Sequence, residues 1–152
     1  MSMILNELLS RQNVITKLVL QSGDKELSKE LKVKIMRIRM AYNKVKKQYD
    51  LDVAEFAKQL VPEEFTDLQN KADRTEEETA LMNEIGIKLD AEYAEYLIQK
   101  GNEEISENID DVFTEEDFSE IVDINSGNDV EFNGVTVKAA DFLEAVYELF
   151  VR

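Results

Sequence analysis

The chain contains neither cysteine nor histidine. Without cysteine it can form no disulfide, thiolate nucleophile or Cys-ligated zinc site, which fits a reducing compartment. Without histidine it lacks the side chain that titrates nearest neutrality, the Ser-His and Cys-His nucleophile pairs, and the usual ligand of zinc and non-haem iron. Carboxylate, lysine and oxygen-ligated hard-cation chemistry remains. We therefore expect a protein that is not an enzyme and uses no cofactor.

Long apolar runs are also missing. None approaches the roughly 20 residues that span a bilayer, and the first residues lack the basic and apolar regions of a signal peptide. The 152 residues are 43% hydrophobic and 34% charged, a composition typical of a folded soluble protein. We expect a cytoplasmic location and no association with membranes.

Proline and glycine are scarce, with one and five copies, and no stretch rich in proline, glycine and serine divides the chain. This favours a single domain over residues 1–152. Within it, residues 1–101 form a helical part, and residues 102–152 hold an acidic segment, a β-hairpin and a last helix.

Charge is divided unevenly along the chain. Residues 1–76 carry 14 Lys/Arg and 12 Asp/Glu, whereas residues 77–152 carry 4 and 21, which gives the net charge of −15. Electrostatics should therefore sort the contacts that the chain makes with itself and with partners.

Hydrophobic spacing predicts several helices in the first part. The first is capped by Ser2 or Asn6 and ends at Gly23. A second, over residues 25–49 after Asp24, carries a heptad seam. A short third helix starts at Asp50 or Asp52 and ends at Pro62, which leads into another helical turn. A capping box at Thr75 begins a helix to Gly101, the expected antiparallel mate of residues 25–49. The seam residues are Leu31, Ile35, Ile38, Tyr42, Val45 and Tyr49.

Residues 102–152 change character. Ile105, Ile109 and Val112 give a sparse helical stripe, and Thr114 caps a short helix. Asn133-Gly134 predicts a two-residue hairpin turn, and residues 139–152 read as a final helix that covers the core. The fold class is therefore mainly α (α+β): an antiparallel helical hairpin or bundle with a small C-terminal β-hairpin and a closing helix.

One candidate partner-binding face is acidic. Residues 103–123 hold ten acids and no Lys or Arg. They could form a solvated face, pair with the basic helix of the same chain, dock on a protein, or imitate the phosphates of a nucleic acid. The candidate binding residues are Glu103, Glu104, Glu107, Asp110, Asp111, Glu115, Glu116 and Asp117.

A second candidate face is the basic helix. Its cations are distributed around the helix without a base-reading motif, and the overall charge of −15 repels polyanions, so we expect contact with an acidic neighbour and not direct nucleic-acid binding. Met36 and Met40 on the flank of the seam could belong to an adaptable docking surface or fill gaps in packing. The candidate cationic residues are Lys32, Arg37, Arg39, Lys44, Lys46 and Lys47.

Metal sites are not indicated. The segment from Asp123 to Asp129 resembles a calcium-binding EF-hand loop, but glycine is out of register and Gly134 stands where the bidentate glutamate belongs. Glu92 and Glu95 have the spacing of a di-metal carboxylate bundle, yet its Glu-x-x-His pair cannot exist here.

The basic helix with Lys34-Ile-Met-Arg-Ile-Arg-Met-Ala-Tyr42, the acidic helix and the segment from Val130 to Leu143 together resemble small acidic proteins of unknown function from tailed bacteriophages and prophages. That resemblance implies a virion or assembly component, or an intracellular factor that acts on a host protein, located in the host cytoplasm or the virion. We expect a non-catalytic protein-interaction module that binds a protein partner or itself. The alternative is an inhibitor that mimics nucleic acid and blocks a host defence enzyme or another DNA- or RNA-binding enzyme.

Overall fold

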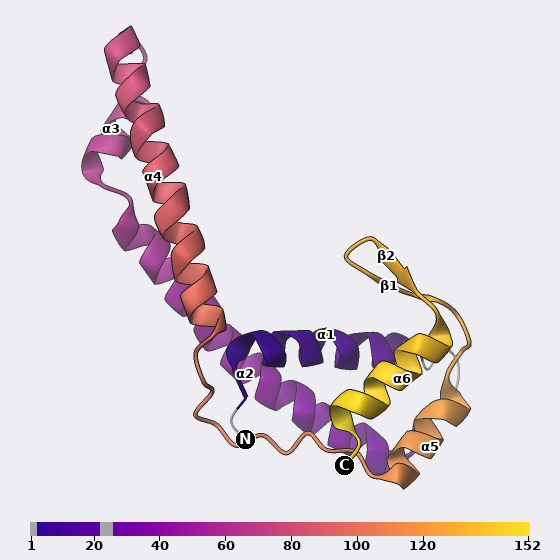
Figure 1. The fold of residues 1–152 in the computed structure, drawn as a ribbon. Coiled ribbons are helices and arrows are strands. Elements are labelled where there is room, and N and C mark those ends of the chain that lie inside the picture. Colours follow the sequence, from indigo (N-terminus) through magenta and orange to yellow (C-terminus); the bar gives the residue numbers. More distant parts are fainter. Residues whose placement is uncertain (1–2, 22–25) are drawn as a thin grey trace. The chain divides into compact units, whose positions relative to one another are not determined.

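A computed structural model describes residues 3–21 and 26–152 of the chain (Figure 1). Helices dominate, and a two-stranded hairpin precedes the last helix, so the predicted fold class is confirmed. Contacts group the residues into two compact units. Unit 1 comprises Met1–Lys44 with Ile105–Arg152, and unit 2 comprises Val45–Glu104.

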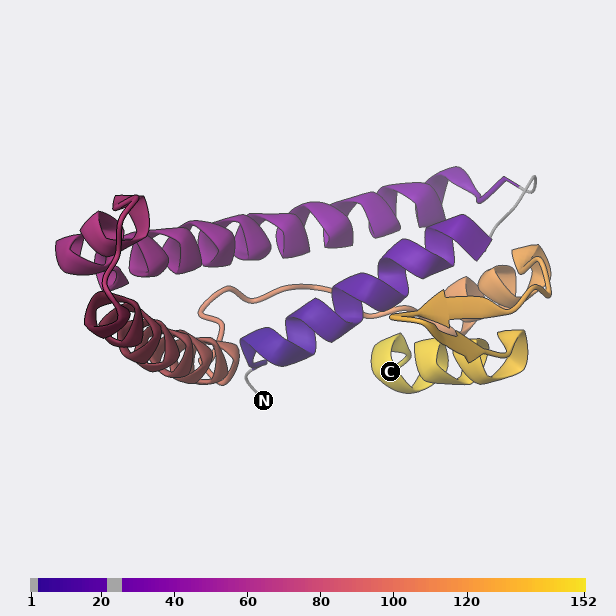
Figure 2. The same cartoon turned by 90° about the horizontal axis from the view of Figure 1, so that it is seen from above.

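Unit 1 combines elements from both ends of the sequence (Figure 2). It contains α1 (Leu5–Gln21), the part of α2 (Lys29–Leu60) up to Lys44, and α5 (Glu115–Ile124). The strands β1 (Val130–Phe132) and β2 (Val135–Val137) and helix α6 (Ala139–Phe150) complete it. Its core is formed by Leu31, Ile35, Ile38 and Tyr42 of the predicted seam and by apolar residues of the other helices and of the 105–114 segment, whereas the predicted seam residues Val45 and Tyr49 belong to unit 2 and are half-buried. The largest fully buried side chains are Tyr42, Phe113, Phe142, Phe150, Leu8, Ile15, Leu31, Ile38, Ile121 and Val146.

The β-hairpin has the predicted register. Phe132 pairs with Val135 across the turn, and Asn133 and Gly134 both have positive φ angles, 49° and 81°. This is the backbone combination that a two-residue hairpin turn requires and that Asn and Gly tolerate best. The ring of Phe132 lies 6.0 Å from that of Phe142 on α6, and Val130 is buried, so β1 covers part of the core of unit 1, whereas Val135 on β2 stays exposed.

Unit 2 is a helical hairpin made of the end of α2, α3 (Glu63–Asn70) and α4 (Glu76–Gly101). Helix α4 starts at the predicted capping box, in which Thr75 and Glu78 satisfy each other's backbone N–H groups. The rings of Phe56 and Tyr96 stack 3.8 Å apart, and Lys100 forms an ion pair with Asp52 (3.0 Å). These contacts join α4 to the second half of α2.

The core of unit 2 is thin. Within residues 45–104, all of which the structure describes, Leu68 is the one large apolar residue that is buried, and 9% of its surface is still exposed. The aromatic and aliphatic residues of the seam between the helices are half-buried. Two antiparallel helices have no third layer to cover such a seam, so packing within unit 2 leaves apolar area exposed to solvent.

Three helix predictions need correction. α2 runs without a break through Asp50 and Asp52, because these carboxylates accept hydrogen bonds from Lys46 and Gln48 one turn earlier and so act within the helix. The partner of α4 in unit 2 is accordingly the 45–60 part of α2, of which the predicted range 25–49 includes only residues 45–49. Residues 105–112 are extended, not helical.

The predicted helix caps have mixed outcomes. Asn6 lies inside α1 and is not its cap. The predictions for Ser2, Gly23 and Asp24 lie outside the described residues. Ser28 was not predicted as a cap, yet its Oγ accepts a hydrogen bond from the backbone N–H of Leu31 (3.3 Å), as an N-cap side chain does.

No helix in the described part of the chain is both long enough and apolar enough to cross a membrane.

Candidate protein-binding surfaces

The ten acids of residues 103–123 do not form one continuous face. Asp111, Asp117 and Glu120 turn inward and make polar contacts with α1 and α2 within unit 1. Each contact is between groups far apart in sequence. This part of the acidic segment therefore holds the fold together.

Asp111 is the most buried of these acids, with 6% of its surface exposed. Its Oδ2 accepts a hydrogen bond from Arg11 Nη1 (2.9 Å) and another from the hydroxyl of Tyr42. The guanidinium of Arg11 also lies over the ring of Phe150, 5.1 Å from its centre. Burial, reinforced by the hydrogen bond to Asp111 and by its negative charge, raises the pKa of Tyr42 well above its usual value. The triad ties the extended 105–113 segment to α1 and α2.

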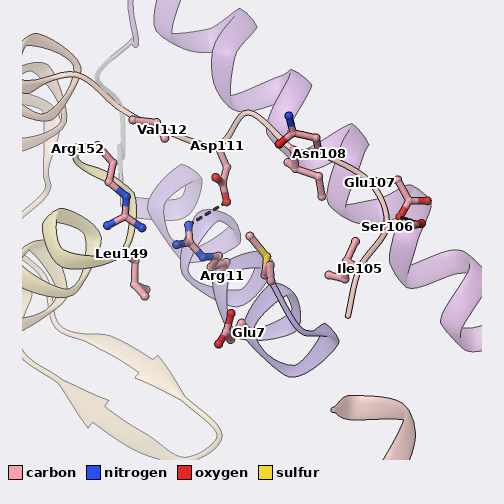
Figure 3. Close-up of a pocket in the computed structure, with 12 residues that line it drawn as sticks. Glu7, Arg11, Ile105, Ser106, Glu107, Asn108, Asp111, Val112, Leu149 and Arg152 are labelled. Atoms are coloured by element: carbon pink, nitrogen blue, oxygen red, sulfur yellow. Dashed lines mark hydrogen bonds and ion pairs between the residues drawn. The ribbon is translucent and has the colours of Figure 1, made fainter. Parts of the chain in front are cut away.

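A cavity of about 460 Å³ opens beside this triad (Figure 3). Arg11 and Asp111 line one part of it, with Glu7 from α1 and Arg152 nearby. The lining also includes the exposed Ser106 and Glu107, and the Ser106 hydroxyl donates a hydrogen bond to the Glu107 carboxylate (3.3 Å).

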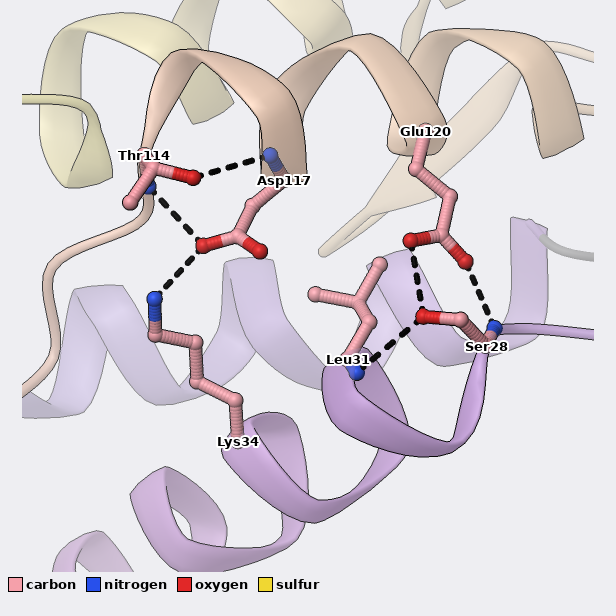
Figure 4. A network of polar contacts seen from close by, with 6 residues as sticks. All are labelled: Ser28, Leu31, Lys34, Thr114, Asp117 and Glu120. Carbon is pink, nitrogen blue, oxygen red and sulfur yellow. Dashed lines mark hydrogen bonds and ion pairs between the residues drawn. The ribbon is translucent and has the colours of Figure 1, made fainter.

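A second network joins α5 to α2 (Figure 4). Lys34 Nζ donates to Asp117 Oδ2 (2.5 Å), and Asp117 also closes the predicted capping box with Thr114. The backbone N–H and the hydroxyl of Ser28 both donate to Glu120, at 2.5 and 2.8 Å. Burial disfavours the charged form of Asp117, but the hydrogen bonds from Lys34 and Thr114 outweigh it and hold the pKa of that carboxyl below its usual value.

The remaining candidate acids are exposed. Glu103 and Glu104 belong to unit 2, where Glu103 forms an ion pair with Lys100 (3.0 Å). In unit 1 the exposed acids are Glu107, Asp110, Glu115 and Glu116. The predicted acidic face therefore loses Asp111 to the core and Asp117 to the Lys34 ion pair. The acidic segment and the basic helix thus pair in part within the same chain.

Most of the candidate cations on α2 face solvent. Lys46 pairs with Asp50 on the same helix (2.8 Å), and it belongs with Lys47 to unit 2. The exposed cations of α2 within unit 1 include Lys32, Arg37, Arg39 and Lys44. Two of these border a groove.

The groove lies between α1 and α2 and has a volume of about 450 Å³. Met36 and Met40 remain 54% and 65% exposed beside it, although both are large apolar side chains. Lys32 and Arg39 supply the cations of the lining, and Glu26 the single acid. The remaining lining residues are Val19, Leu27, Ile35 and Asn43.

Sequence reasoning placed the two methionines beside the seam but missed the groove, because its other side is formed by Val19 of α1 and by Glu26 and Leu27, which precede α2. A signal was present: each of Lys32, Met36, Arg39, Met40 and Asn43 lies three or four residues from another member of the set, which places them on one face of a helix.

The described residues contain no group of three or more acids that could hold a metal ion. Comparison of the chain with protein-family models, curated proteins and solved structures gives no match.

Proposed function

We propose that this protein is a non-catalytic interaction module that binds an acidic amphipathic helix of a protein partner in the α1–α2 groove. The observation that carries the proposal is the groove itself, an apolar floor with exposed methionines and a cationic lining on a chain whose net charge is −15. Methionine-rich surfaces adapt to different apolar side chains, as helix-binding grooves require.

The shape of the groove favours a helix as its occupant. Its α2 wall runs from Lys32 to Asn43, which is three helical turns or about 16 Å. A helix of that length presents apolar anchors at positions i, i+3 or i+4, and i+7 along one side. Met36 and Met40 would contact these anchors, while Lys32 and Arg39 meet acidic side chains on the flank of the ligand.

Charge adds selectivity to this apolar contact. The cations at the groove act locally, since the Debye length at physiological ionic strength is about 8 Å, whereas the rest of the chain repels long polyanions. Exposed acids such as Glu107, Asp110 and Glu116 then govern the rate and specificity of association more than the affinity. An acidic helix with an apolar face offers both the apolar contact and the short run of negative charge that this groove selects, and a nucleic acid does not.

The probe for a test is a labelled synthetic amphipathic helix with leucines on one face and glutamates on its flanks, followed by fluorescence anisotropy. We expect saturable binding that a lysine-flanked version of the peptide does not show. The double variant Lys32→Glu with Arg39→Glu should weaken binding about tenfold, with each rim charge contributing up to about 1 kcal/mol.

The matched control is the double variant Arg37→Glu with Lys44→Glu, which reverses two exposed cations of α2 that do not line the groove. Its affinity for the peptide should stay within about twofold of that of the wild-type protein. Equal losses in the two double variants, or no binding of the glutamate-flanked peptide, would refute the groove as the binding site.

The role of such a module in phage assembly or in binding a host factor is part of this proposal and follows from the resemblance alone. A nucleic-acid mimic would act differently, through its acids. Reversing the charges of Glu107, Asp110 and Glu116 would then abolish binding to the target enzyme, and the protein would compete with DNA or RNA for that enzyme. Neither result is expected for a partner held in the α1–α2 groove.

A further inference from the structure

Helix α4 carries a second apolar stripe on the side that does not contact α2 or α3. Its seam side is marked by Tyr96, which stacks on Phe56, and by Gly86, whose position lies against the ring of Phe65. The stripe lies more than a quarter-turn away from that side and consists of Ile87, Ala91, Ala94 and Ile98. Ile87 and Ile98 are 72% and 65% exposed, and both alanines are exposed.

The stripe reads the same in both directions. The sequence of residue types is Ile, Ala, Ala, Ile at steps of four, three and four. If a second α4 lay antiparallel across it, each Ile87 would meet an Ile98 and each Ala91 an Ala94. A two-fold symmetric interface needs this kind of self-complementary surface. The small alanines at the centre allow the two helices to approach closely.

Charges beside the stripe favour the antiparallel arrangement. In the heptad that puts the stripe at the a and d positions, Lys88 and Glu95 both occupy e positions and Asp90 a g position. An antiparallel pair sets e against e, so Lys88 of each copy faces Glu95 of the other. A parallel pair sets g against e and would place Asp90 beside Glu95, so that two negative charges would repel each other. Lys88 and Glu95 are exposed, and Glu95 accepts one long hydrogen bond from Gln99 (3.4 Å).

We infer that the Ile87–Ile98 stripe of α4 binds the same stripe of a second copy of this chain, with the two helices antiparallel. Such a contact has a physical reason, because a second copy would cover Ile87 and Ile98, which the hairpin leaves exposed on the side of α4 away from its seam. This interface uses unit 2 and does not depend on the α1–α2 groove.

The dimer should be weak. The stripe spans only two heptads, and unit 2 carries 7 Lys/Arg against 16 Asp/Glu, so each copy brings a net charge of −9. A contact of this size belongs with weak, transient interfaces, and we expect a dissociation constant on the order of tens of micromolar.

Sedimentation equilibrium of the full chain across protein concentrations that bracket about 50 µM tests this inference. We expect a mass that rises from 17.5 kDa toward twice that value. The variant Ile87→Gln removes two isoleucine contacts per dimer and should weaken it about a hundredfold. Its control is Leu81→Gln, a half-exposed apolar residue of α4 outside the stripe, which should leave dimerisation unchanged. Circular dichroism establishes that each variant keeps its helical content.

Charge exchange tests the orientation. Lys88→Glu and Glu95→Lys should each weaken the dimer about tenfold, because each places like charges at both symmetric pairs, and the double variant should restore wild-type affinity. A chain that stays monomeric throughout, or a dimer that Ile87→Gln leaves intact, would overturn the inference. A double variant no better than the single ones would overturn the antiparallel pairing, and restoration would support it even if Ile87→Gln lost helical content.

Discussion

The buried Asp111 triad gives the sharpest test of how unit 1 is held together. Asp111 accepts hydrogen bonds from Arg11 and Tyr42, and all three side chains are largely removed from water. Replacing Asp111 with alanine leaves a guanidinium and a phenol without their acceptor. Breaking a buried ion pair by removing one partner costs about 3–5 kcal/mol. Tyr42→Phe removes one hydrogen bond to a charged group, for which the cost is about 1.5–3 kcal/mol.

Urea denaturation followed by far-ultraviolet circular dichroism measures these free energies of unfolding. We expect Asp111→Ala to cost about twice as much as Tyr42→Phe. The double variant should cost less than the sum of the two, with a coupling free energy of about 0.5–3 kcal/mol. If Asp111→Ala costs less than about 1 kcal/mol, as a typical surface substitution does, then the triad does not hold the 105–113 segment to the helices.

Alkaline pH provides an independent check on the same triad. Because the pKa of Tyr42 is raised on folding, the unfolded chain loses the phenol proton at a pH where the folded chain keeps it. The contribution of Tyr42 to the free energy of unfolding is therefore fully present below about pH 10 and falls by about 1.4 kcal/mol for each pH unit above that. The difference between wild type and Tyr42→Phe should shrink over the same range. A constant difference up to the alkaline limit of the experiment would contradict the assignment.

Two further predictions concern other parts of unit 1. Because the pKa of Asp117 is lowered in the fold, its contribution is present above about pH 4 and is lost as pH falls below that value. In urea denaturation, Lys34→Gln should therefore lower the free energy of unfolding by less than about 1 kcal/mol at neutral pH and leave it unchanged in acid. A loss of stability that grows in acid would contradict this prediction. Gly134→Ala places a side chain at φ 81° and should cost about 1 kcal/mol or a few degrees of melting temperature, whereas Thr136→Ala on the exposed side of the hairpin should cost less.

Local chemistry made much of this fold predictable from sequence. The Thr75 and Thr114 capping boxes and the Asn133-Gly134 turn are each decided by a few neighbouring residues, and all three form as expected. The buried part of the α2 seam was predictable for the same reason, because the spacing of Leu31 and Tyr42 within the heptad puts them on one face of the helix.

Features that depend on distant residues were not predictable. The helix break expected at Asp50 failed because aspartate is compatible with both a cap and a helical interior, and the residues one turn before it decide between the two. The extended form of residues 105–112 depends on backbone hydrogen bonds to remote groups, such as that from Ile105 N–H to Met3 O (2.8 Å). The burial of Asp111 required knowing that Arg11 and Tyr42 would meet it, and the α1–α2 groove required knowing where α1 lies.

Unit 2 interrupts unit 1 in the sequence, and this order has a consequence for synthesis on the ribosome. The helices of unit 2 can pair once Gly101 has emerged, but the apolar side of α2 around Tyr42 waits for Phe113, Phe142 and Phe150. At about 5–20 residues per second, translating the intervening hundred or so residues takes roughly 5–20 seconds. During that interval the side of α2 around Tyr42 lacks the contacts with these aromatic residues that complete its burial.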